Sequence, residues 1–397
     1  MCGAHVASMT GFSTYATLLP GLQDEWGMNN SQAGFISGMF FAGYMAAVPV
    51  LTSLTDRMDA RRIYLASSLV AAAALAGFAF LVEGVKSAAL LQLAAGAGIA
   101  GTYMPGLRAL TDNVEGTRVQ SRAVAFYTAV FGLGTSLSIL LSGSIADAIG
   151  WRWAFALTSA GPVVAGVLVM RGLPPRRPER SHALHVLDFR PVLASREVRP
   201  YILGYAVHCW ELFGSRSWLV AFVMFAQGLQ AAGGAASPAW SAVTIAAVAN
   251  LFGPAASIYG NELAMRHGRE RLIWKAMLAS GVLTCALGFV SFLPLYALAG
   301  LVMLHMCLIM GDSSALTAGV VTRANERIRG ATMAVHSMLG FGAGFVAPLV
   351  FGVVLDLAGG KANPSAWGLA FTTLGAGAIL MAGLIRARVR PDAAPES

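Results

Sequence analysis

Charged side chains are scarce in this chain. Asp, Glu, Lys and Arg together make up only 12% of its 397 residues, whereas they make up roughly a quarter of a soluble globular domain. Hydrophobic residues account for 56%, and the mean hydropathy is +0.66. The apolar runs are continuous and do not alternate, which favours helices over a membrane barrel. The composition therefore excludes a large soluble enzyme domain and predicts an all-α, polytopic membrane protein.

Motifs for metals, disulfides and nucleotides are also lacking. The four cysteines, Cys2, Cys209, Cys285 and Cys307, show neither close pairing nor the spacing of metal ligands. The phosphate-binding loop Gly-x-x-x-x-Gly-Lys-Ser/Thr does not occur. We therefore expect no metal, no cofactor, no catalytic residue and no hydrolysis of ATP by this chain.

Apolar runs of spanning length dominate what is present. A membrane-spanning helix needs about 20 predominantly apolar residues, and twelve such runs follow one another with short connections. We predict twelve transmembrane helices in two bundles of six. Their predicted ranges are 3–22, 32–53, 63–82, 88–107, 123–146, 153–173, 200–226, 240–260, 273–293, 296–317, 331–354 and 366–385.

The basic residues lie on alternate connections. Of the 27 Lys and Arg residues, 23 fall on one side, including two just within span ends, and three on the other. The remaining one, Arg216, lies deep inside a span. Because basic loops stay in the cytoplasm, both termini are predicted to be cytoplasmic and the protein to lie in the cell inner membrane. The net charge of +8 then reflects topology and contact with lipid headgroups, and no nucleic acid is expected as a partner.

The longest connection divides the chain. Residues 174–199 are rich in Pro and Arg and predict a cytoplasmic linker between a bundle at 1–173 and another at 200–386. Residues 387–397 form a tail. The first span begins almost at the N-terminus with no basic segment before it, so we expect no cleaved signal peptide; a start codon placed too late is the alternative.

The two halves show an internal repeat. At a constant shift of 209 residues, Asp147 coincides with Asp356, and Tyr127 takes the position of His336. Arg57 likewise coincides with Arg266. A fixed offset without gaps indicates parallel duplication of a six-helix unit.

Three short motifs resemble one family. Residues 54–62 read Leu-Thr-Asp-Arg-Met-Asp-Ala-Arg-Arg, residues 150–155 read Gly-Trp-Arg-Trp-Ala-Phe, and residues 96–98 read Gly-Ala-Gly. They are similar to a cytoplasmic loop signature, a junction and a glycine pattern of the major facilitator superfamily (MFS) of secondary transporters. The resemblance implies a fold in which two bundles rock about a midplane site. Gln92, where proton-coupled members often carry Arg, departs from the family pattern.

The loop signature predicts a gate. We expect Asp56 to face the positive N-terminal end of the helix near Gly330. The basic residues of this loop are then expected to pair with acids of a neighbouring loop and close the cytoplasmic side. The alternative is that these arginines only fix topology. The predicted gating residues are Asp56, Arg57, Arg61, Arg62, Asp112 and Glu115, with Arg266 and Arg269 in the second-half copy.

The seventh predicted span is the richest in ionisable residues inside the membrane. At about 100° per residue, four of its side chains fall within an arc of about 80°; we call His208, Glu211, Ser215 and Trp218 the polar stripe. In the family the first, fourth, seventh and tenth helices surround the central cavity, so the resemblance implies that this stripe faces substrate. The alternative is a buried network that only fastens helices.

Coupling to protons requires a group that changes protonation between two states. Glu211 beside His208 is the expected site, because burial disfavours a charged carboxyl and a nearby imidazolium favours it. Arg216 lies about 140° from Glu211 around the helix. It is expected either to pair across helices, which favours an anionic substrate, or to extend toward the membrane surface.

The sequence therefore predicts a monomeric, proton-coupled secondary transporter of a small organic solute, with an organic anion as the favoured substrate. A transporter-like receptor that binds a solute and signals is the alternative. A lone Tyr or Asn in a helix bundle also serves helix packing. The predicted substrate-binding residues are Tyr15, Tyr103, Tyr127, His208, Trp210, Arg216, Trp218, Asn250, His305 and His336.

Overall fold

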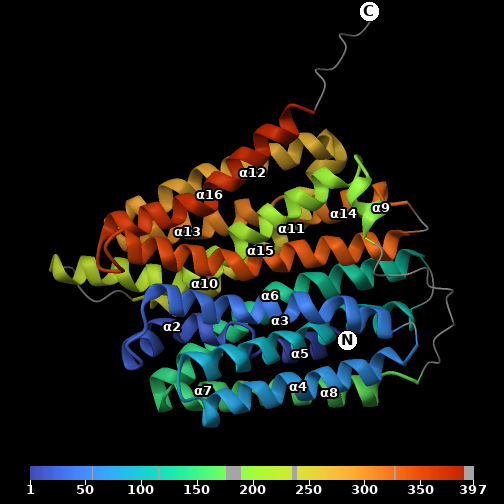
Figure 1. Cartoon of the computed structure of the whole chain (residues 1–397), viewed down its shortest axis with the longest axis horizontal. Helices are drawn as coiled ribbons and strands as arrows, with labels where there is room; N and C mark the ends of the chain where they lie inside the picture. The colour runs from blue at the N-terminus through green and yellow to red at the C-terminus, as the bar shows by residue number, and fades with distance from the viewer. Residues whose placement is uncertain (56, 115–116, 176–188, 235–238, 326–327, 389–397) are drawn as a thin grey trace, which may run out of the picture.

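The computed structural model describes residues 1–55, 57–114, 117–175, 189–234, 239–325 and 328–388. This part of the chain is helical and contains no strand. Figure 1 shows two halves lying one above the other, the first coloured blue to green and the second yellow to red. The long helices run roughly along the longest axis of the molecule.

The described residues of the first half form eight helices. The predicted first and sixth spans are each formed by two consecutive helices. The helices are α1 (Cys2–Ser8), α2 (Thr14–Glu25), α3 (Asn30–Leu54), α4 (Ala60–Leu81), α5 (Val85–Thr111), α6 (Thr117–Ile149), α7 (Trp151–Thr158) and α8 (Ala160–Gly172).

The second half begins after a short helix of the linker, α9 (Arg190–Ala194). The predicted tenth span is formed by two helices that meet at residues 311–312. The helices are α10 (Arg199–Ala232), α11 (Ala242–His267), α12 (Arg269–Leu287) with a 3₁₀ turn (Gly288–Val290), α13 (Leu295–Met310), α14 (Ser313–Arg323), α15 (Arg329–Leu357) and α16 (Pro364–Arg386).

The predicted all-α membrane architecture is confirmed. A helix or a pair of consecutive helices lies at each of the twelve predicted positions. Ten helical segments of the described residues are long and apolar enough to cross a membrane by length and composition. Large apolar side chains within helices, such as Phe80 of α4 and Leu380 and Leu384 of α16, are strongly exposed on the outer surface, as expected for helices that face lipid.

Successive turns alternate between the two ends of the molecule. We call the end that carries α9 and the turns at 57–59 and 112–114 the linker end, and the opposite end, with the turns at 26–29 and 358–363, the far end. In Figure 1 the linker end is on the right. α1 begins and α16 ends at the linker end.

Helices α3 and α15 bring the two halves into close contact. A Cβ atom added at Gly34 would lie 2.1 Å from the carbonyl oxygen of Pro348, and one at Gly38 would lie 2.2 Å from that of Phe345. Glycine is therefore required at both positions for the two backbones to approach. Helices α6 and α11 form a second contact between the halves, where the Ser136 hydroxyl donates to the Ala247 carbonyl at 2.9 Å.

Asp356 joins the halves at the far end. From the C-terminal end of α15, its carboxylate accepts hydrogen bonds from the backbone N–H groups of Asn30 (3.0 Å) and Ser31 (2.8 Å) at the start of α3. The Asn30 amide and the Ser31 hydroxyl also donate to it. Lys361 pairs with Asp24 nearby. A carboxylate on the positive end of a helix is a favourable contact, so these contacts hold the two halves together at the far end.

The ion pairs at the linker end differ from the predicted gate. Arg61 pairs with Asp59 at 3.0 Å and also donates to the Leu173 carbonyl. Asp112 pairs with Arg108, four residues earlier on α5, at 3.0 Å. The expected pairing of Arg61 with Asp112 is therefore wrong, because each residue has a nearer partner within its own segment.

The other predicted gating residues add little. Arg57, Arg62 and Arg266 are exposed. Arg269 lies 3.4 Å from the Thr322 hydroxyl and interacts electrostatically with Glu270 of its own helix. Asp56 and Glu115, and with them the predicted contact near Gly330, lie outside the described residues.

Candidate functional site

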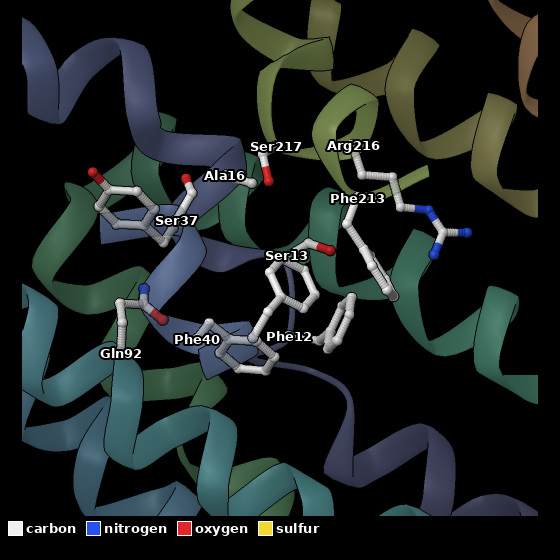
Figure 2. Close-up of a pocket in the computed structure, with 11 residues that line it drawn as sticks. Phe12, Ser13, Ala16, Ser37, Phe40, Gln92, Phe213, Arg216 and Ser217 are labelled. Carbon is white, nitrogen blue, oxygen red and sulfur yellow. The ribbon is translucent and has the colours of Figure 1, made fainter. Parts of the chain in front are cut away.

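A small cavity lies between the two halves. It encloses about 30 Å³, enough for two or three water molecules at about 10–15 Å³ each. α2, α3 and α5 of the first half face α10 of the second half across it (Figure 2). Its polar side chains are Ser13, Tyr15, Ser37, Gln92, Arg216 and Ser217.

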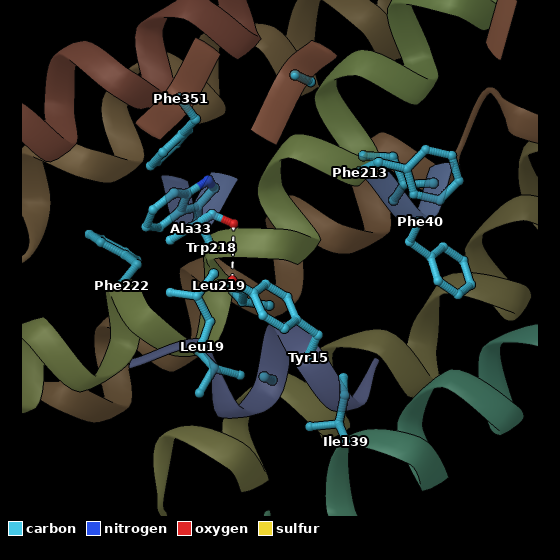
Figure 3. Close-up of a cluster of buried hydrophobic side chains, with 14 of the residues drawn as sticks. Tyr15, Leu19, Ala33, Phe40, Ile139, Phe213, Trp218, Leu219, Phe222 and Phe351 are labelled. Carbon is cyan, nitrogen blue, oxygen red and sulfur yellow. Dashed lines mark hydrogen bonds between the residues drawn. The ribbon is translucent and has the colours of Figure 1, made fainter. Parts of the chain in front are cut away.

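Aromatic rings form much of the cavity wall. Phe12 meets Phe40 edge-on at 5.2 Å between ring centroids, and Phe41 packs on Phe213 of the other half at 4.3 Å. The Tyr15 hydroxyl donates to the Ala33 carbonyl at 3.3 Å, as Figure 3 shows. The wall therefore offers ring faces and edges to an apolar or aromatic ligand.

Arg216 brings a positive charge to this cavity. Its Nε and Nη1 atoms are buried and have no hydrogen-bond partner, and no acidic residue of the described chain lies within ion-pair distance. Figure 2 shows the guanidinium extending past Phe213, away from Ser37. It reaches 5.9 Å from the centroid of Phe131. Neither expected arrangement, an ion pair across helices or extension toward the membrane surface, is observed.

A second, smaller cavity adjoins Arg216. Asn250 of α11 and Thr135 of α6 contribute to its wall. The Asn250 amide nitrogen donates to the Ala246 carbonyl at 2.9 Å, whereas its Oδ1 atom has no partner. Buried polar atoms without partners are rare in folded proteins, so Arg216 and Asn250 make this place the candidate site for a polar ligand.

The polar stripe of α10 does not face this cavity. At about 100° per residue, Phe213, Arg216 and Ser217 share one face of α10, and the stripe is centred on the opposite face. Trp218 illustrates this, because it is fully buried and donates from Nε1 to the Pro348 carbonyl at 3.0 Å. The expectation that the stripe faces the central cavity is therefore wrong; it points into the second half.

Glu211 instead belongs to a buried hydrogen-bond network. Its Oε1 lies 2.5 Å from the Thr284 hydroxyl and its Oε2 lies 3.0 Å from the Ser280 hydroxyl, both on α12. Thr284 Oγ1 in turn lies 3.1 Å from His305 Nδ1, and His305 Nε2 lies 3.2 Å from Ser215 Oγ. All five side chains are buried, so His305 is a member of this network and does not line the cavity.

The carboxyl beside His208 is that of Asp312. His208 Nδ1 lies 2.8 Å from Asp312 Oδ1, and both side chains are buried. Asp312 sits in the break between α13 and α14. The sequence predicted Glu211 beside His208. The two residues are three positions apart on α10, but among the described residues the acid within ion-pair distance of His208 is Asp312.

Tyr127 and His336, equivalent in the repeat, both stack on a ring from the first helix of their own half. Tyr127 stacks on His5 at 4.5 Å, and His336 stacks on Tyr205 at 3.8 Å. The Tyr127 hydroxyl donates to the carbonyls of Thr102 (2.8 Å) and Tyr103 (3.1 Å). The two equivalent residues therefore also pack in a similar way. The sequence did not predict their stacking partners, His5 and Tyr205.

The other predicted residues lie away from the cavity wall. Tyr103 packs 5.3 Å from His5, and Trp210 is half-buried and donates to the Thr373 carbonyl at 3.0 Å. Of the ten predicted substrate-binding residues, the structure brings Tyr15, Arg216 and Asn250 to the two cavities. The sequence missed the aromatic wall, and projection of the opposite face of α10 would have found Phe213.

Solved structures with the same fold are known. Over 97% of this chain, the nucleoside transporter NupG has a TM-score of 0.76 at 12% identity, with 98% of its own length covered. A bacterial homologue of the human lysosomal transporter Spinster, in an inward-facing and unoccupied conformation, has a TM-score of 0.73 at 14% identity over 97% of this chain and 93% of its own. These likenesses concern the fold.

Curated relatives match a shorter segment. A putative tartrate transporter of Agrobacterium vitis is 25% identical over 166 residues, which cover 40% of this chain and 38% of that protein. The 4-hydroxybenzoate transporter PcaK of Acinetobacter baylyi is 24% identical over 157 residues, 40% of this chain and 34% of PcaK. The chain thus matches little more than a third of the length of these relatives.

A family model covers almost the whole chain. The model of the Major Facilitator Superfamily matches residues 1–382, which agrees with the helical architecture, the apolar spans and the transporter relatives. The chain is a multi-pass membrane protein and belongs to the Major Facilitator Superfamily.

Proposed function

We propose that this protein is a secondary active transporter that moves a small organic anion across the cell inner membrane by alternating access. One observation carries the proposal: Arg216 presents unpartnered buried N–H donors between the two halves, beside a wall of phenylalanine rings. A buried cation without a partner is costly, and an anionic ligand would remove that cost.

The chemistry of the site favours a carboxylate. A guanidinium binds a carboxylate through two parallel hydrogen bonds, and the rings of Phe12, Phe41 and Phe213 suit the organic part of the ligand. Relatives described as carriers of tartrate and of 4-hydroxybenzoate support an organic acid as the substrate.

Alternating access requires the far end to open. With the arginine-rich linker end in the cytoplasm, the contacts of Asp356 with Asn30 and Ser31 close the opposite, external side. A cavity of about 30 Å³ is too small for an organic acid, so binding must separate the halves further at one end. The buried groups Glu211 and His208 are the candidates for coupling this movement to protons.

Transport in proteoliposomes tests the proposal. Purified protein is reconstituted with an imposed pH gradient, and the uptake of radiolabelled 4-hydroxybenzoate, of tartrate and of the neutral 4-hydroxybenzamide is measured. We expect uptake of an acid and not of the amide. Binding without uptake would instead favour a receptor and would contradict the proposal.

Arg216→Gln removes the proposed anion anchor. Charge-assisted hydrogen bonds contribute about 1.5–3 kcal/mol each, so the apparent affinity for the acid should fall about 10- to 100-fold. Arg152→Gln is the matched control, because Arg152 is exposed and lies 3.9 Å from Glu25 at the far end. An equal loss in both variants would rule out a specific role for Arg216.

A further inference from the structure

Two ionisable side chains buried on different faces of helix α10, Arg216 and Glu211, lack an ion-pair partner among the described residues. Arg216 faces the cavity between the halves and Glu211 faces the interior of the second half. They are about 140° apart around the helix and about 7.5 Å apart along it. Among the described residues, neither side chain has an oppositely charged partner within ion-pair distance.

The charge of the neighbouring acid, Asp312, is compensated in a different way. Asp312 has the His208 imidazole at 2.8 Å, so a proton on that ring makes the pair neutral overall. The titratable groups that face Glu211 are His305 of α13, reached through the Thr284 hydroxyl, and Asp312 in the break before α14. Cys285 of α12 is a further titratable neighbour of Glu211. His208 of α10 pairs with Asp312, and His336 of α15 acts on His208. None of these groups is a permanent cation.

The surroundings of Glu211 satisfy the carboxyl in both protonation states. When it is ionised, the hydroxyls of Thr284 and Ser280 both donate to it. When it is protonated, its O–H donates to Thr284 Oγ1, and the Thr284 hydroxyl then donates to the Ser280 carbonyl at 2.8 Å or to His305 Nδ1 at 3.1 Å. Since a hydroxyl holds one proton and accepts another, a proton can come and go here without a buried atom losing its partner.

We propose that Glu211 carries the co-transported proton and Arg216 the carboxylate, so that one organic monoanion and one proton cross together without net charge. This inference rests on the proposed function. In the empty protein, the Glu211 carboxylate and the Arg216 guanidinium sum to zero. In the loaded protein, the proton neutralises Glu211 and the substrate carboxylate neutralises Arg216, so the sum is again zero.

The coupling follows from the cost of burying net charge. A protein with only the proton bound carries one uncompensated positive charge, and one with only the anion carries one negative charge. Moving such a charge through the low-dielectric interior costs several kcal/mol, so these half-loaded forms reorient rarely. The empty and the fully loaded forms are the ones that reorient, and the proton gradient thereby drives the anion.

The stoichiometry of the unmodified protein is the first test. Uptake of 4-hydroxybenzoate into proteoliposomes is measured with either a pH gradient or a valinomycin-imposed potassium potential, and proton entry is recorded with an internal pH dye. Protein-free vesicles and the Arg216→Gln protein report passive entry of the free acid. We expect accumulation with the pH gradient alone and one proton per anion. Uptake driven by the potential, or uptake of the dianion tartrate but not of the monoanion, overturns the inference.

Glu211→Gln is the second test. The amide resembles the protonated acid, so the loaded form stays neutral whereas the empty form gains a positive charge. We expect exchange of labelled for unlabelled 4-hydroxybenzoate to continue in preloaded vesicles, and accumulation driven by the pH gradient to fall at least ten-fold. Glu262→Gln, at an exposed acid of α11, is the matched control and should keep both activities.

The two proposals fail in different ways. A wild-type protein that takes up no organic acid overturns the proposed function and this inference with it. A wild-type protein that accumulates the acid under a membrane potential overturns only the inference. Should the Gln variant retain accumulation driven by the pH gradient, Glu211 is not the proton site. The stoichiometry of the wild-type protein tests the inference even if that variant does not fold.

Discussion

At the scale of single residues, what a buried ionisable group can do depends on its partners. Arg216 and Asp312 are both deep in the second half's helices, but only Asp312 has a counter-group, His208 at 2.8 Å. When a buried group has its partner in place, removing that partner leaves an uncompensated charge and destabilises the fold. A group without one, such as Arg216, is available to a ligand. This distinction separates the residues that fasten α10 from those proposed to bind substrate.

Asp312→Asn tests the fastening role. Removing one partner of a buried charged pair costs about 3–5 kcal/mol, so the midpoint of thermal unfolding in detergent should fall clearly. Asp112→Asn is the matched control: its pair with Arg108 is largely exposed (35% and 47%), and exposed pairs contribute about 0–1 kcal/mol. Equal midpoints for the two variants would contradict a fastening role for Asp312.

At the scale of helices, the apolar runs predicted where each helix lies but not how it is rotated. A run of about 20 apolar residues identifies a span by its length, which is why every predicted position contains a helix. The face that a span presents to its neighbours depends on packing. The sequence predicted that the residues of the polar stripe share one face of the helix. Only the contacts with Thr284, Ser280 and Pro348 show that this face points into the second half.

The hydrophobic pattern of the sequence also did not predict the breaks within spans. The tenth span reads as one apolar run, but α13 and α14 meet at Gly311 and Asp312. Asp312 at this break lies 2.8 Å from His208, a contact that a continuous apolar run does not predict. The sequence therefore predicted which buried ionisable residues to consider, above all Arg216 and Glu211. It did not predict their geometry, because the geometry depends on helix rotation and on these breaks.

The start of α3 and the end of α15 form the element that we expect to open. Asp356→Ala removes four hydrogen bonds to Asn30 and Ser31, which should raise the population open at the far end. A cysteine placed at Ser37 in the cavity wall, with the native cysteines replaced by serine, reports this through a membrane-impermeant maleimide added outside. We expect labelling to rise several-fold.

The repeat supplies the control for that experiment. Asp147, equivalent to Asp356 at the shift of 209, is exposed on α6. Asp147→Ala should therefore leave labelling unchanged. If the Asp356 variant labels no faster than wild type, the far-end contact does not limit opening.

At the scale of the whole molecule, the halves are joined along α3 and α15 by backbone contact. Lipid provides no hydrophobic force that presses helices together, so close approach at small residues does most of that work. The approach is closest at glycines, where the Gly34 and Gly38 positions of α3 meet the carbonyls of Pro348 and Phe345. A transporter whose halves rock against each other needs this seam to close repeatedly to the same geometry.

Gly38→Ala tests the seam. Alanine favours a helix by about 1 kcal/mol over glycine, but its Cβ at this position would lie 2.2 Å from the Phe345 carbonyl oxygen, which α15 can relieve only by moving away. Gly300→Ala on α13 is the matched control, because nothing lies within 4 Å of the added atom. We expect the Gly300 variant to unfold at the same or a higher temperature, and the Gly38 variant to unfold lower and to transport more slowly. Equal unfolding temperatures and transport rates for the two variants would mean that α3 and α15 pack less tightly at Gly38 than the structure shows. The seam would then not control how the two halves move.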